Sequence, residues 1–422
     1  MKVLGIVAEY NPFHNGHLYQ FNTAKELVKP DYSVAVMSGN FLQRGEPALF
    51  DKYTRTKMAL HGGLDAIFEL PAYYALSSAD EFAAAAVITL SKVGVTHISF
   101  GVEAEHFEDL VAIAKFSVSE PEDFQVHLKS MLKKGLSYPK AYAMSIAKFL
   151  GTEIDESVLS TPNNMLAIGY LKAIYKYCPE MIPVPVVRKE AAYHDNHIHG
   201  DICSATAIRN TIMQMRSFKN EDNSDVNNAL IGAIPTSTFN LMPIENELIQ
   251  GMFLDDFAKD MQYVMLTSTY EELTNTYDIS SELANRITNT DLTCVTTDEF
   301  YQGLLSKQYT STRIQRACMH RLLQMTQDEF ANLKAHNYIF YVRLLGVRKN
   351  ALSYLKEARA HCDVPFIQKT SEGKKELQAT STQGFLLFQK DILASDLYRM
   401  HWFHKYGTPL LSDYQQNAII ET

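Results

Sequence analysis

The chain has 422 residues, of which 46% are hydrophobic, and a formal net charge of −9 at pH 7. This length favours two domains, and the hydrophobic content is ample for buried cores. The net acidity excludes a generally basic coat for nucleic acid but leaves room for a local basic face.

The cysteines and the N-terminus indicate the compartment. The five cysteines are odd in number, dispersed and without a CxxC pair: Cys178, Cys203, Cys294, Cys318 and Cys362. This pattern predicts free thiols in a reducing environment rather than disulfides or zinc ligands. The first apolar run follows a single charge, Lys2, and is too short for a signal peptide or a membrane span. We therefore expect a cytoplasmic protein with no membrane association.

The first expected element is a strand over Val3–Ala8, which ends before Asn11-Pro12. Apolar residues then recur at helical spacing from Leu18 to Val28, so His14-Asn15-Gly16-His17 sits where a strand turns into a helix. A helix N-terminus offers unpaired N–H groups to a phosphate, and imidazoles can donate hydrogen bonds to oxygens that gain charge in a transition state. One histidine could instead cap the helix while the other packs. The position in the chain favours nucleotide chemistry.

Four further strands are expected at residues 32–37, 65–70, 95–100 and 182–187, with helical stretches such as 51–60 and 78–90 between them. Strands that alternate with helices predict an α/β fold with a Rossmann-like, doubly wound parallel sheet. Ligands bind beyond the carboxyl ends of the strands in such sheets. The residues that follow each strand are therefore the candidates for a site.

Those residues are rich in polar side chains and glycine. The loop 38–47, SGNFLQRGEP, follows the second strand, Gly101 ends the fourth and Arg188 follows the fifth. Asn163 lies at the start of a helix, where it could cap the helix or bind a ligand. A second phosphate cradle is expected at the start of another helix, from Ser204, Thr206 and Arg209. We assign this cradle to a departing pyrophosphate and the two histidines to the α-phosphate.

The chain beyond the fourth strand is predicted to be helical in two places. Residues 102–160 read as a helical insertion with four lysines, which could touch RNA or form a solvated face: Lys129, Lys133, Lys134 and Lys140. The polar stretch 218–228 suits a domain boundary. We therefore expect a catalytic domain at 1–215, with the insertion at 102–160, and an all-helical RNA-binding domain at 216–422.

Basic residues cluster in the expected C-terminal domain. Residues 303–327 contain no acidic residue but include Lys307, and one helical face carries Arg313, Arg316 and His320 while the other carries Ile314, Cys318, Leu322 and Met325. A second basic run holds Arg343, Arg348, Lys349 and Lys356, interleaved with Tyr341 and Tyr354. Such clusters in an acidic protein predict RNA contact, although a solvated surface could also produce them. The expected tRNA-binding residues are Arg313, Arg316, Arg321, Arg343, Arg348 and Lys349.

Several segments together resemble a known family. Residues 14–17 (HNGH), 37–48 (MSGNFLQRGEPA), 65–71 (DAIFELP), 204–209 (SATAIR), 309–316 and 341–346 are similar to the bacterial tRNA(Met) cytidine acetate ligases of the HxGH nucleotidyltransferase superfamily. Many adenylyltransferases share HxGH, whereas the long glycine-containing loop is more specific. The resemblance implies that ATP and acetate form acetyl-adenylate and pyrophosphate. It also implies transfer of the acetyl group to N4 of the wobble cytidine of elongator tRNA(Met).

The resemblance also implies the ATP contacts. They come from Gly101, Asn163 and Arg188 and from the N-terminal loop, which comprises Val7, Ala8, Glu9, Tyr10, Asn11, Pro12, Phe13, His14, Asn15, Gly16, His17, Leu18, Tyr19 and Gln20. A second superfamily motif usually has two adjacent serines, and here Cys203 and Ser204 occupy these positions. Attack of acetate on the α-phosphate depends mainly on positioning and charge stabilisation. No compact carboxylate cluster predicts a protein-held metal, so Mg²⁺ is expected to arrive with ATP.

Two other functions stay open from the sequence. A small-molecule adenylyltransferase, acting on a mononucleotide or phosphopantetheine, would use the HxGH chemistry. It would not explain the basic clusters of the expected C-terminal helical domain. A non-catalytic, nucleotide-gated RNA-binding protein would use the basic faces but would not need both histidines. The sequence does not predict the oligomeric state.

Overall fold

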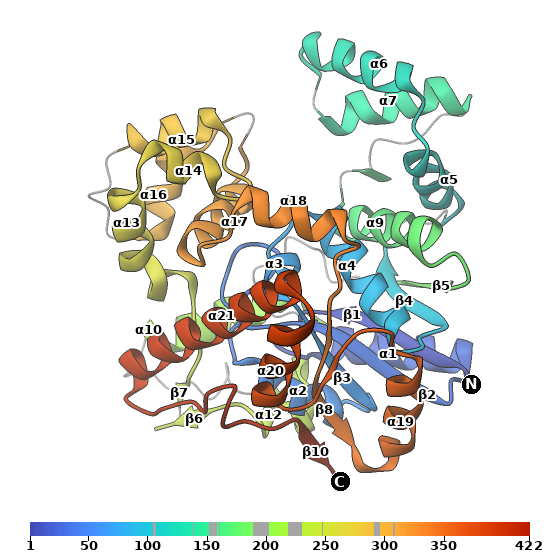
Figure 1. The fold of residues 1–422 in the computed structure, drawn as a ribbon, viewed down its shortest axis with the longest axis vertical. Coiled ribbons are helices and arrows are strands. Elements are labelled where there is room, and N and C mark those ends of the chain that lie inside the picture. The colour runs from blue at the N-terminus through green and yellow to red at the C-terminus, as the bar shows by residue number, and fades with distance from the viewer. Residues whose placement is uncertain are drawn as a thin grey trace.

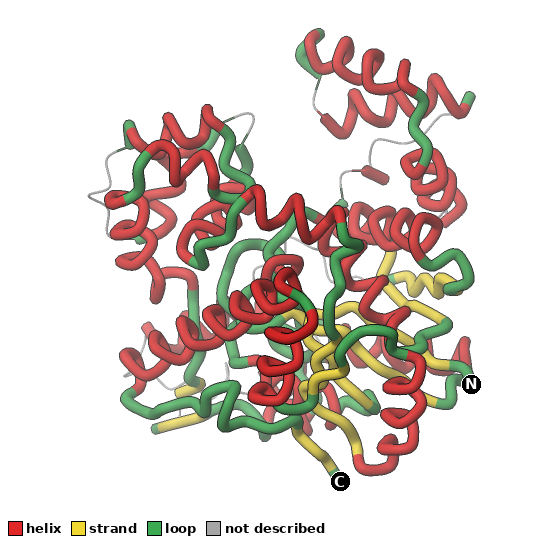
Figure 2. The backbone as a smooth tube through the Cα atoms, viewed as in Figure 1, coloured by secondary structure: helices red, strands yellow, loops and turns green. Residues whose placement is uncertain are grey.

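The centre of the molecule is one mostly parallel sheet with helices around it (Figures 1 and 2). The computed structural model describes residues 1–103, 107–136, 138–151, 158–159, 161–188, 202–217, 230–246, 248–290, 296–306 and 309–422. The strands of the main sheet are β1 (Val3–Ala8), β2 (Tyr32–Ser38), β3 (Ala66–Leu70), β4 (His97–Val102), β5 (Ile182–Val187), β8 (Val342–Arg348), β9 (Phe366–Ile367) and β10 (Ile419–Glu421). A separate antiparallel pair is formed by β6 (Ile244–Glu245) and β7 (Leu248–Ile249).

The strand order of the main sheet is β10-β8-β3-β2-β1-β4-β5, with β9 beside β8. Strands β1 to β5 are parallel to one another, as the alternating sequence pattern predicts, and β8 runs antiparallel to β3. The central strand β1 is buried on both faces of the sheet, with α1 against one face and α4 against the other, which explains its continuous apolar run. The α/β class and the parallel sheet expected from the sequence are confirmed.

The helices before the middle of the chain are α1 (Asn15–Val28), α2 (Lys52–His61), α3 (Ala72–Ala75), α4 (Ala79–Lys92), α5 (Phe107–Val118), α6 (Glu122–Lys133), α7 (Tyr138–Leu150), α9 (Pro162–Tyr177) and α10 (Ala205–Ser217). Those after it are α12 (Thr236–Phe239), η1 (Leu254–Phe257), α13 (Ala258–Thr267), α14 (Tyr270–Asn275), α15 (Ser281–Thr288), α16 (Thr297–Leu304), α17 (Ser311–Leu322), α18 (Gln327–Ala335), η2 (Lys349–Ala351), α19 (Leu352–His361), α20 (Thr370–Thr380) and α21 (Thr382–Tyr406). Within the described residues, no helix is both long enough and apolar enough to cross a membrane.

Two groups of helices stand away from the sheet on the same side of the molecule (Figure 1). One comprises α5, α6 and α7, which lie in the insertion expected after the fourth strand. The other comprises α13 to α17. Between them, α4 packs against α9 and connects the first group to the sheet.

The C-terminal half differs from the all-helical domain that the sequence predicts. Strands β8, β9 and β10 come from this half and belong to the main sheet, so that expectation is wrong. Strand β8 lies between helices in the sequence, and its pairing partner β3 lies far away in the chain. The expected boundary between residues 215 and 216 falls inside α10, and the stretch 218–228 lies outside the described residues. The division into two domains stays a prediction.

The cysteines in the described part of the chain are free thiols, as expected. Cys203 and Cys318 are buried, and Cys178 and Cys362 are half-buried. Cys294 lies outside the described residues.

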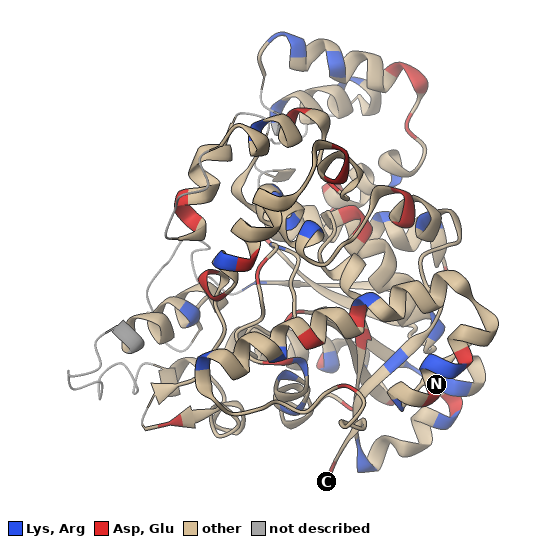
Figure 3. Ribbon diagram, turned by 60° about the vertical axis from the view of Figure 1, so that its left-hand side comes forward, with Lys and Arg blue, Asp and Glu red and all other residues tan. Residues whose placement is uncertain are grey.

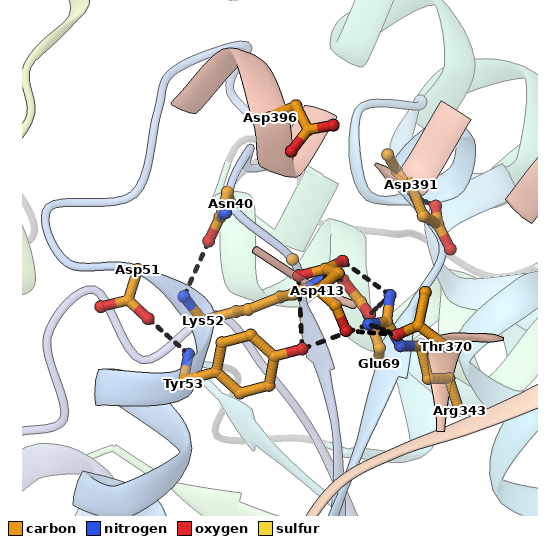
Figure 4. A network of polar contacts seen from close by, with 12 residues as sticks. Asn40, Asp51, Lys52, Tyr53, Glu69, Arg343, Thr370, Asp391, Asp396 and Asp413 are labelled. Carbon is orange, nitrogen blue, oxygen red and sulfur yellow. Dashed lines mark hydrogen bonds and ion pairs between the residues drawn. The ribbon is translucent and has the colours of Figure 1, made fainter. Parts of the chain in front are cut away.

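A buried network of charges joins β3, α2, β8 and the C-terminal segment (Figure 4). Lys52 Nζ lies 2.7 Å from Glu69 Oε1 and 2.8 Å from Asp413 Oδ2. Arg343 Nη1 lies 3.1 Å from Glu69 Oε2 and 2.9 Å from Asp413 Oδ2. The second guanidinium nitrogen of Arg343 donates to the hydroxyl groups of Tyr53 and Thr370. Two cations thus meet two anions, so each charge is compensated without water.

Arg343 was expected to bind tRNA, and the network corrects that expectation. The residue is only 3% exposed, and its guanidinium is already engaged by two carboxylates. A phosphate could not reach it without breaking the core. Its basic charge neutralises Glu69 and Asp413 across the β3–β8 pair.

The charge network predicts a pH-dependent contribution of Asp413 to stability. Burial by itself would raise the pKa of Asp413, but Arg343 and Lys52 outweigh burial and hold the pKa well below its usual range. A carboxyl whose pKa is depressed on folding stabilises the protein above its unfolded pKa of about 3.9, and this stabilisation is lost as the pH falls through the folded value.

We therefore predict that Asp413→Asn lowers the free energy of unfolding by about 3–5 kcal/mol at pH 7, because two buried cations then share one carboxylate. The difference between the parent and the variant should narrow at pH 3. Denaturant unfolding at both pH values measures it. The control is Asp396→Asn, whose carboxylate is 52% exposed and pairs with Arg399 on the helix surface. Equal effects of the two substitutions would contradict the assigned role of the network.

Candidate active site at the carboxyl ends of the strands

A cavity with two adjoining lobes, of about 200 and 350 Å³, lies beyond the carboxyl end of β1. Both lobes are lined by residues from the end of β1, the start of α1, the first turns of α9 and the residue after β5. The residues common to both lobes are Val7, Ala8, Glu9, His14, His17, Asn163, Leu166, Tyr170 and Arg188. The lobes are therefore two parts of one site.

The two lobes differ in their other walls. The smaller lobe is also lined by Tyr10, Gly16, Tyr19, Gln20, Gly101 and Cys203. The larger lobe is also lined by Gln43, Arg44 and Glu46 of the β2–α2 loop, by Phe82, and by Ser204, Thr206 and Arg209 at the start of α10. Residues predicted from six separate segments thus meet at one edge of the sheet. Gly101 lies within β4, paired with Val186, and not after its end as expected.

Five residues of the predicted N-terminal loop do not line the described lobes: Asn11, Pro12, Phe13, Asn15 and Leu18. The side-chain oxygen of Asn11 accepts the N–H of Leu49, and Asn15 Nδ2 donates to the carbonyl of Gly232. Phe13 is buried in the core, where its ring fills the space that a Cβ at Gly62 would occupy. Asn11, Phe13 and Asn15 therefore hold the loop in place from outside the cavity.

Tyr10 bends the chain at the end of β1. Its φ of 48° is left-handed, which is uncommon for a residue with a large side chain and is typical of functional loops. The buried Tyr10 ring packs edge-on against Phe13 and His17, with ring centroids 4.9 and 5.0 Å apart. This packing fixes the ring of His17 at the start of α1.

The two histidines are oriented by backbone N–H groups. His14 is the N-cap of α1, and its Nδ1 accepts the N–H of Gly16 at 3.0 Å. His17 Nδ1 in turn accepts the N–H of His14 at 3.3 Å. A neutral imidazole whose Nδ1 accepts a hydrogen bond carries its proton on Nε2. Both rings therefore present an Nε2–H donor, and their centroids lie 3.9 Å apart.

Both histidines are neutral at physiological pH. Burial and the nearby Arg188 and Arg209 lower the pKa of His14 to about 3, and burial together with His14 and Arg188 holds the pKa of His17 well below its usual value. Neutral rings donate hydrogen bonds but carry no charge of their own. The cations that line the described lobes are instead Arg44, Arg188 and Arg209.

The phosphate cradle predicted at the start of α10 has a defined geometry. Ser204 Oγ accepts the N–H of Ala207 at 3.0 Å, which caps the helix. Arg209 donates to the carbonyl of Asn11 at 3.1 Å and lies 3.2 Å from the Glu46 carboxylate. Arg209 thus joins the N-terminal loop, the β2–α2 loop and α10. Across the described residues, no three His, Cys, Asp or Glu side chains gather as a metal-binding group.

Sequence reasoning missed Arg55, which organises the edge of the sheet. This buried residue of α2 donates through Nη1 to the carbonyls of Glu9, at 2.6 Å, and Ser38, at 3.1 Å. Its other nitrogens donate to the carbonyls of Phe50 and Gly39. Burial lowers the pKa of Arg55 to about 10, so the side chain still carries its charge at neutral pH. No local pattern marks Arg55, because Thr54 and Thr56 flank it and the charged Asp51 and Lys52 lie one helical turn before it.

The β2–α2 loop docks on α17, the helix that carries the first basic cluster. Gly45 has a φ of +77°, and a Cβ there would lie 2.4 Å from the backbone nitrogen of Arg316. Only glycine fits this contact. The loop that lines the larger lobe therefore also rests on the C-terminal helices.

The arginines of the first basic cluster are largely paired within the protein. Arg313, 36% exposed, lies 3.2 Å from Asp278 and stacks over Tyr309, whereas Arg316 is 12% exposed and 3.5 Å from the same carboxylate. Arg321 donates to Ser268 and lies 3.4 Å from Glu272. Among the described residues of this cluster, Arg313 is the arginine most open to solvent. Lys307 lies outside the described residues.

The structure corrects the expected exposure of His320 and places Arg348 and Lys349 far from the cavity. His320, expected on the basic face with Arg313, is fully buried, with ring nitrogens 3.1 and 3.0 Å from the carbonyls of Tyr277 and Leu76. Arg348 and Lys349 follow β8, which is antiparallel to β3, and the N–H of Arg348 bonds to Asp65 just before β3. They therefore lie at the edge of the sheet opposite the cavity. Figure 3 shows basic and acidic residues interspersed along the ribbon rather than one large basic face.

Comparisons with known proteins identify the family of this chain. The model of the HIGH Nucleotidyl Transferase family matches residues 1–408. The chain is 36% identical over 402 residues to a tRNA(Met) cytidine acetate ligase of Thermoanaerobacter sp. (strain X514), with 95% of each chain covered. It is 35% identical to that of Thermosipho africanus, with both chains fully covered.

Solved structures give the same result. The apo structure of Thermotoga maritima TmcAL has a TM-score of 0.89 and 30% identity, and covers 100% of both chains. The same protein bound with alpha-thio ATP has a TM-score of 0.86, again with full coverage. The match between the HxGH site, the parallel sheet and these full-length relatives leads to one conclusion. The chain belongs to the HIGH nucleotidyl transferase family.

Proposed function

We propose that this chain is a tRNA(Met) cytidine acetate ligase, which activates acetate with ATP and transfers the acetyl group to N4 of the wobble cytidine of elongator tRNA(Met). The main support comes from His14 and His17, whose Nδ1 atoms accept backbone N–H groups. The Nε2–H groups of both rings can therefore donate hydrogen bonds to a phosphate. The curated relatives bear the name of this activity and support it over a small-molecule adenylyltransferase or a non-catalytic RNA-binding protein.

In the first half-reaction, an acetate oxygen attacks the α-phosphate of ATP and pyrophosphate leaves. Neutral histidines can donate hydrogen bonds to the α-phosphate oxygens as they gain charge, and they need no proton transfer to do so. Arg188 and Arg209 line the larger lobe with Ser204 and Thr206, and this cationic wall suits the departing pyrophosphate. Mg²⁺ enters with ATP as part of the substrate.

The adenosine is expected to occupy the smaller lobe. Gly101 leaves its wall open: a Cβ there would lie 3.3 Å from the side chain of Arg188 and 4.0 Å from Gln20. Asn163 donates to Glu103 and is thereby fixed at the start of α9. The predicted ATP contacts with Gly101, Asn163 and Arg188 therefore fit one lobe, with the N-terminal loop as its opposite wall.

The tRNA is proposed to contact the helices beside the larger lobe. Arg313 on α17 is the arginine of the first basic cluster whose guanidinium is most accessible, and α17 carries the β2–α2 loop of the site. Arg316 and Arg321 support this face but are largely paired with Asp278 and Glu272. The exposed lysines of α6 and α7 offer a second surface.

The function is tested by acetate-dependent exchange of labelled pyrophosphate into ATP. We expect exchange with acetate and ATP alone, followed by N4-acetylcytidine in elongator tRNA(Met) when tRNA is added. Nucleoside mass spectrometry detects the product. Exchange that instead requires a mononucleotide or pantetheine acceptor would support an adenylyltransferase acting on small molecules.

We predict that His17→Ala reduces acetate-dependent exchange about a hundredfold or more, the scale for removing one transition-state donor. The fold should persist, because the half-buried side chain lies in the first turn of α1 and its Nδ1 accepts a single backbone hydrogen bond. The matched control is His336→Ala, which removes an exposed histidine of α18. Full activity of the His17 variant, with an unchanged melting temperature, would show that His17 packs against its neighbours and does not take part in catalysis.

We predict that Arg313→Gln weakens tRNA binding and reduces the slope of log affinity against log salt by about 0.9, the value for one phosphate contact. Acetate-dependent exchange should not change. Lys349→Gln, at the opposite edge of the sheet, should leave the slope at the parent value. Filter binding across a salt series measures both variants. A reduced slope for Lys349→Gln alone would indicate that the RNA-binding surface lies at the second basic run, which includes Arg348 and Lys349.

A further inference from the structure

The second half-reaction needs a group that the histidines do not supply. When the N4 amino group of cytidine attacks the acetyl carbonyl carbon, the nitrogen becomes acidic and must lose a proton. His14 and His17 present Nε2–H donors, because both Nδ1 atoms already accept backbone N–H groups. A carboxylate that borders the cavity is the side chain best suited to accept that proton.

Glu9 is the carboxylate shared by the described walls of both lobes. It follows β1 directly and borders both the lobe assigned to adenosine and the lobe assigned to the departing pyrophosphate. Its Oε1 accepts the N–H of Gln43 at 2.8 Å, and its backbone carbonyl accepts Arg55 Nη1 at 2.6 Å. The side chain is thus held at both ends. Within the described residues, the other carboxylate oxygen of Glu9, Oε2, accepts no hydrogen bond.

The other ionisable groups of the described walls are poorer proton acceptors. Glu46 lines the larger lobe alone and lies 3.2 Å from Arg209. Burial raises the pKa of the Tyr170 hydroxyl above its usual value and that of the Cys203 thiol to about 11, so both keep their protons at neutral pH. Glu9 is the carboxylate that remains.

We propose that the Glu9 carboxylate is the general base for acetyl transfer, accepting the proton that leaves N4 of cytidine. The proposal rests on the proposed function. The N4–carbon bond forms while the bond from the acetyl carbon to the phosphate-linked oxygen breaks. AMP leaves with that oxygen and its electron pair. One N4 hydrogen passes to Glu9 and then to solvent.

The surroundings of Glu9 suit a base that acts near neutral pH. Burial raises the pKa of Glu9, and the nearby Glu46 carboxylate adds to that effect. The N–H of Gln43 and the cations Arg44 and Arg209 oppose it, yet the net direction is upward. A carboxylate with a raised pKa accepts a proton more readily than one exposed to water.

The test separates the two half-reactions. The parent and Glu9→Gln are assayed for acetate-dependent pyrophosphate exchange and, in a single turnover, for transfer of labelled acetyl to elongator tRNA(Met). Glu9→Gln keeps the shape and the acceptor for Gln43. We expect the ratio of transfer rate to exchange rate to fall about a hundredfold. Glu26→Gln, which removes an exposed carboxylate from α1, should leave this ratio at the parent value.

The pH dependence gives a second readout. The parent transfer rate should fall as the pH drops through the raised pKa of Glu9, because the protonated acid accepts no proton. Glu9→Gln should lack that decline. A parent that fails to support exchange would overturn the proposed function itself. An active parent whose Glu9→Gln variant loses exchange and transfer in proportion, or retains both, would overturn only the role of Glu9.

Discussion

The site depends on one buried arginine that holds backbone carbonyls. Parallel strands bring their carboxyl ends to one edge, but the loops that follow must still be held in position. Arg55 does this by donating to the carbonyls of Glu9, Ser38 and Gly39, which belong to the ends of β1 and β2. Because its guanidinium is buried, releasing any of these bonds would leave a charge without solvent. The positions of Glu9 and of the β2–α2 loop follow from this constraint.

The fixed edge lets one cavity serve two reactions. Adenylation needs hydrogen-bond donors for the α-phosphate oxygens as they gain charge, and His14 and His17, whose Nδ1 atoms accept backbone N–H groups, are proposed to provide them. Acyl transfer needs a proton acceptor in the same space, and Glu9 borders both lobes. The β2–α2 loop rests on α17 through Gly45. The part of the site facing the acceptor is thus built against the helices proposed to bind tRNA.

Local patterns in the sequence predicted much of the site, whereas burial that depends on distant partners was not predictable. His14 and His17 are visible because strand, turn and helix follow one another within a few residues. Gly101, Arg188 and Ser204 follow from the rule that ligands bind at the carboxyl edge of a parallel sheet. Arg343 was misjudged because its partner Asp413 is 70 residues away, and Lys52 pairs with the same carboxylate across 361 residues. From the sequence alone, the basic residue Arg343 was therefore interpreted as a charge on the protein surface.

In the proposed reaction one acetate oxygen passes to AMP, because this oxygen attacks the α-phosphate and stays bound to it when the acetyl group moves to cytidine. Acetate labelled with ¹⁸O tests this directly. After complete turnover with ATP and elongator tRNA(Met), mass spectrometry should find one ¹⁸O atom in each AMP. It should also find the acetyl group attached to cytidine. Unlabelled AMP, or release of ADP with labelled phosphate, would contradict the account.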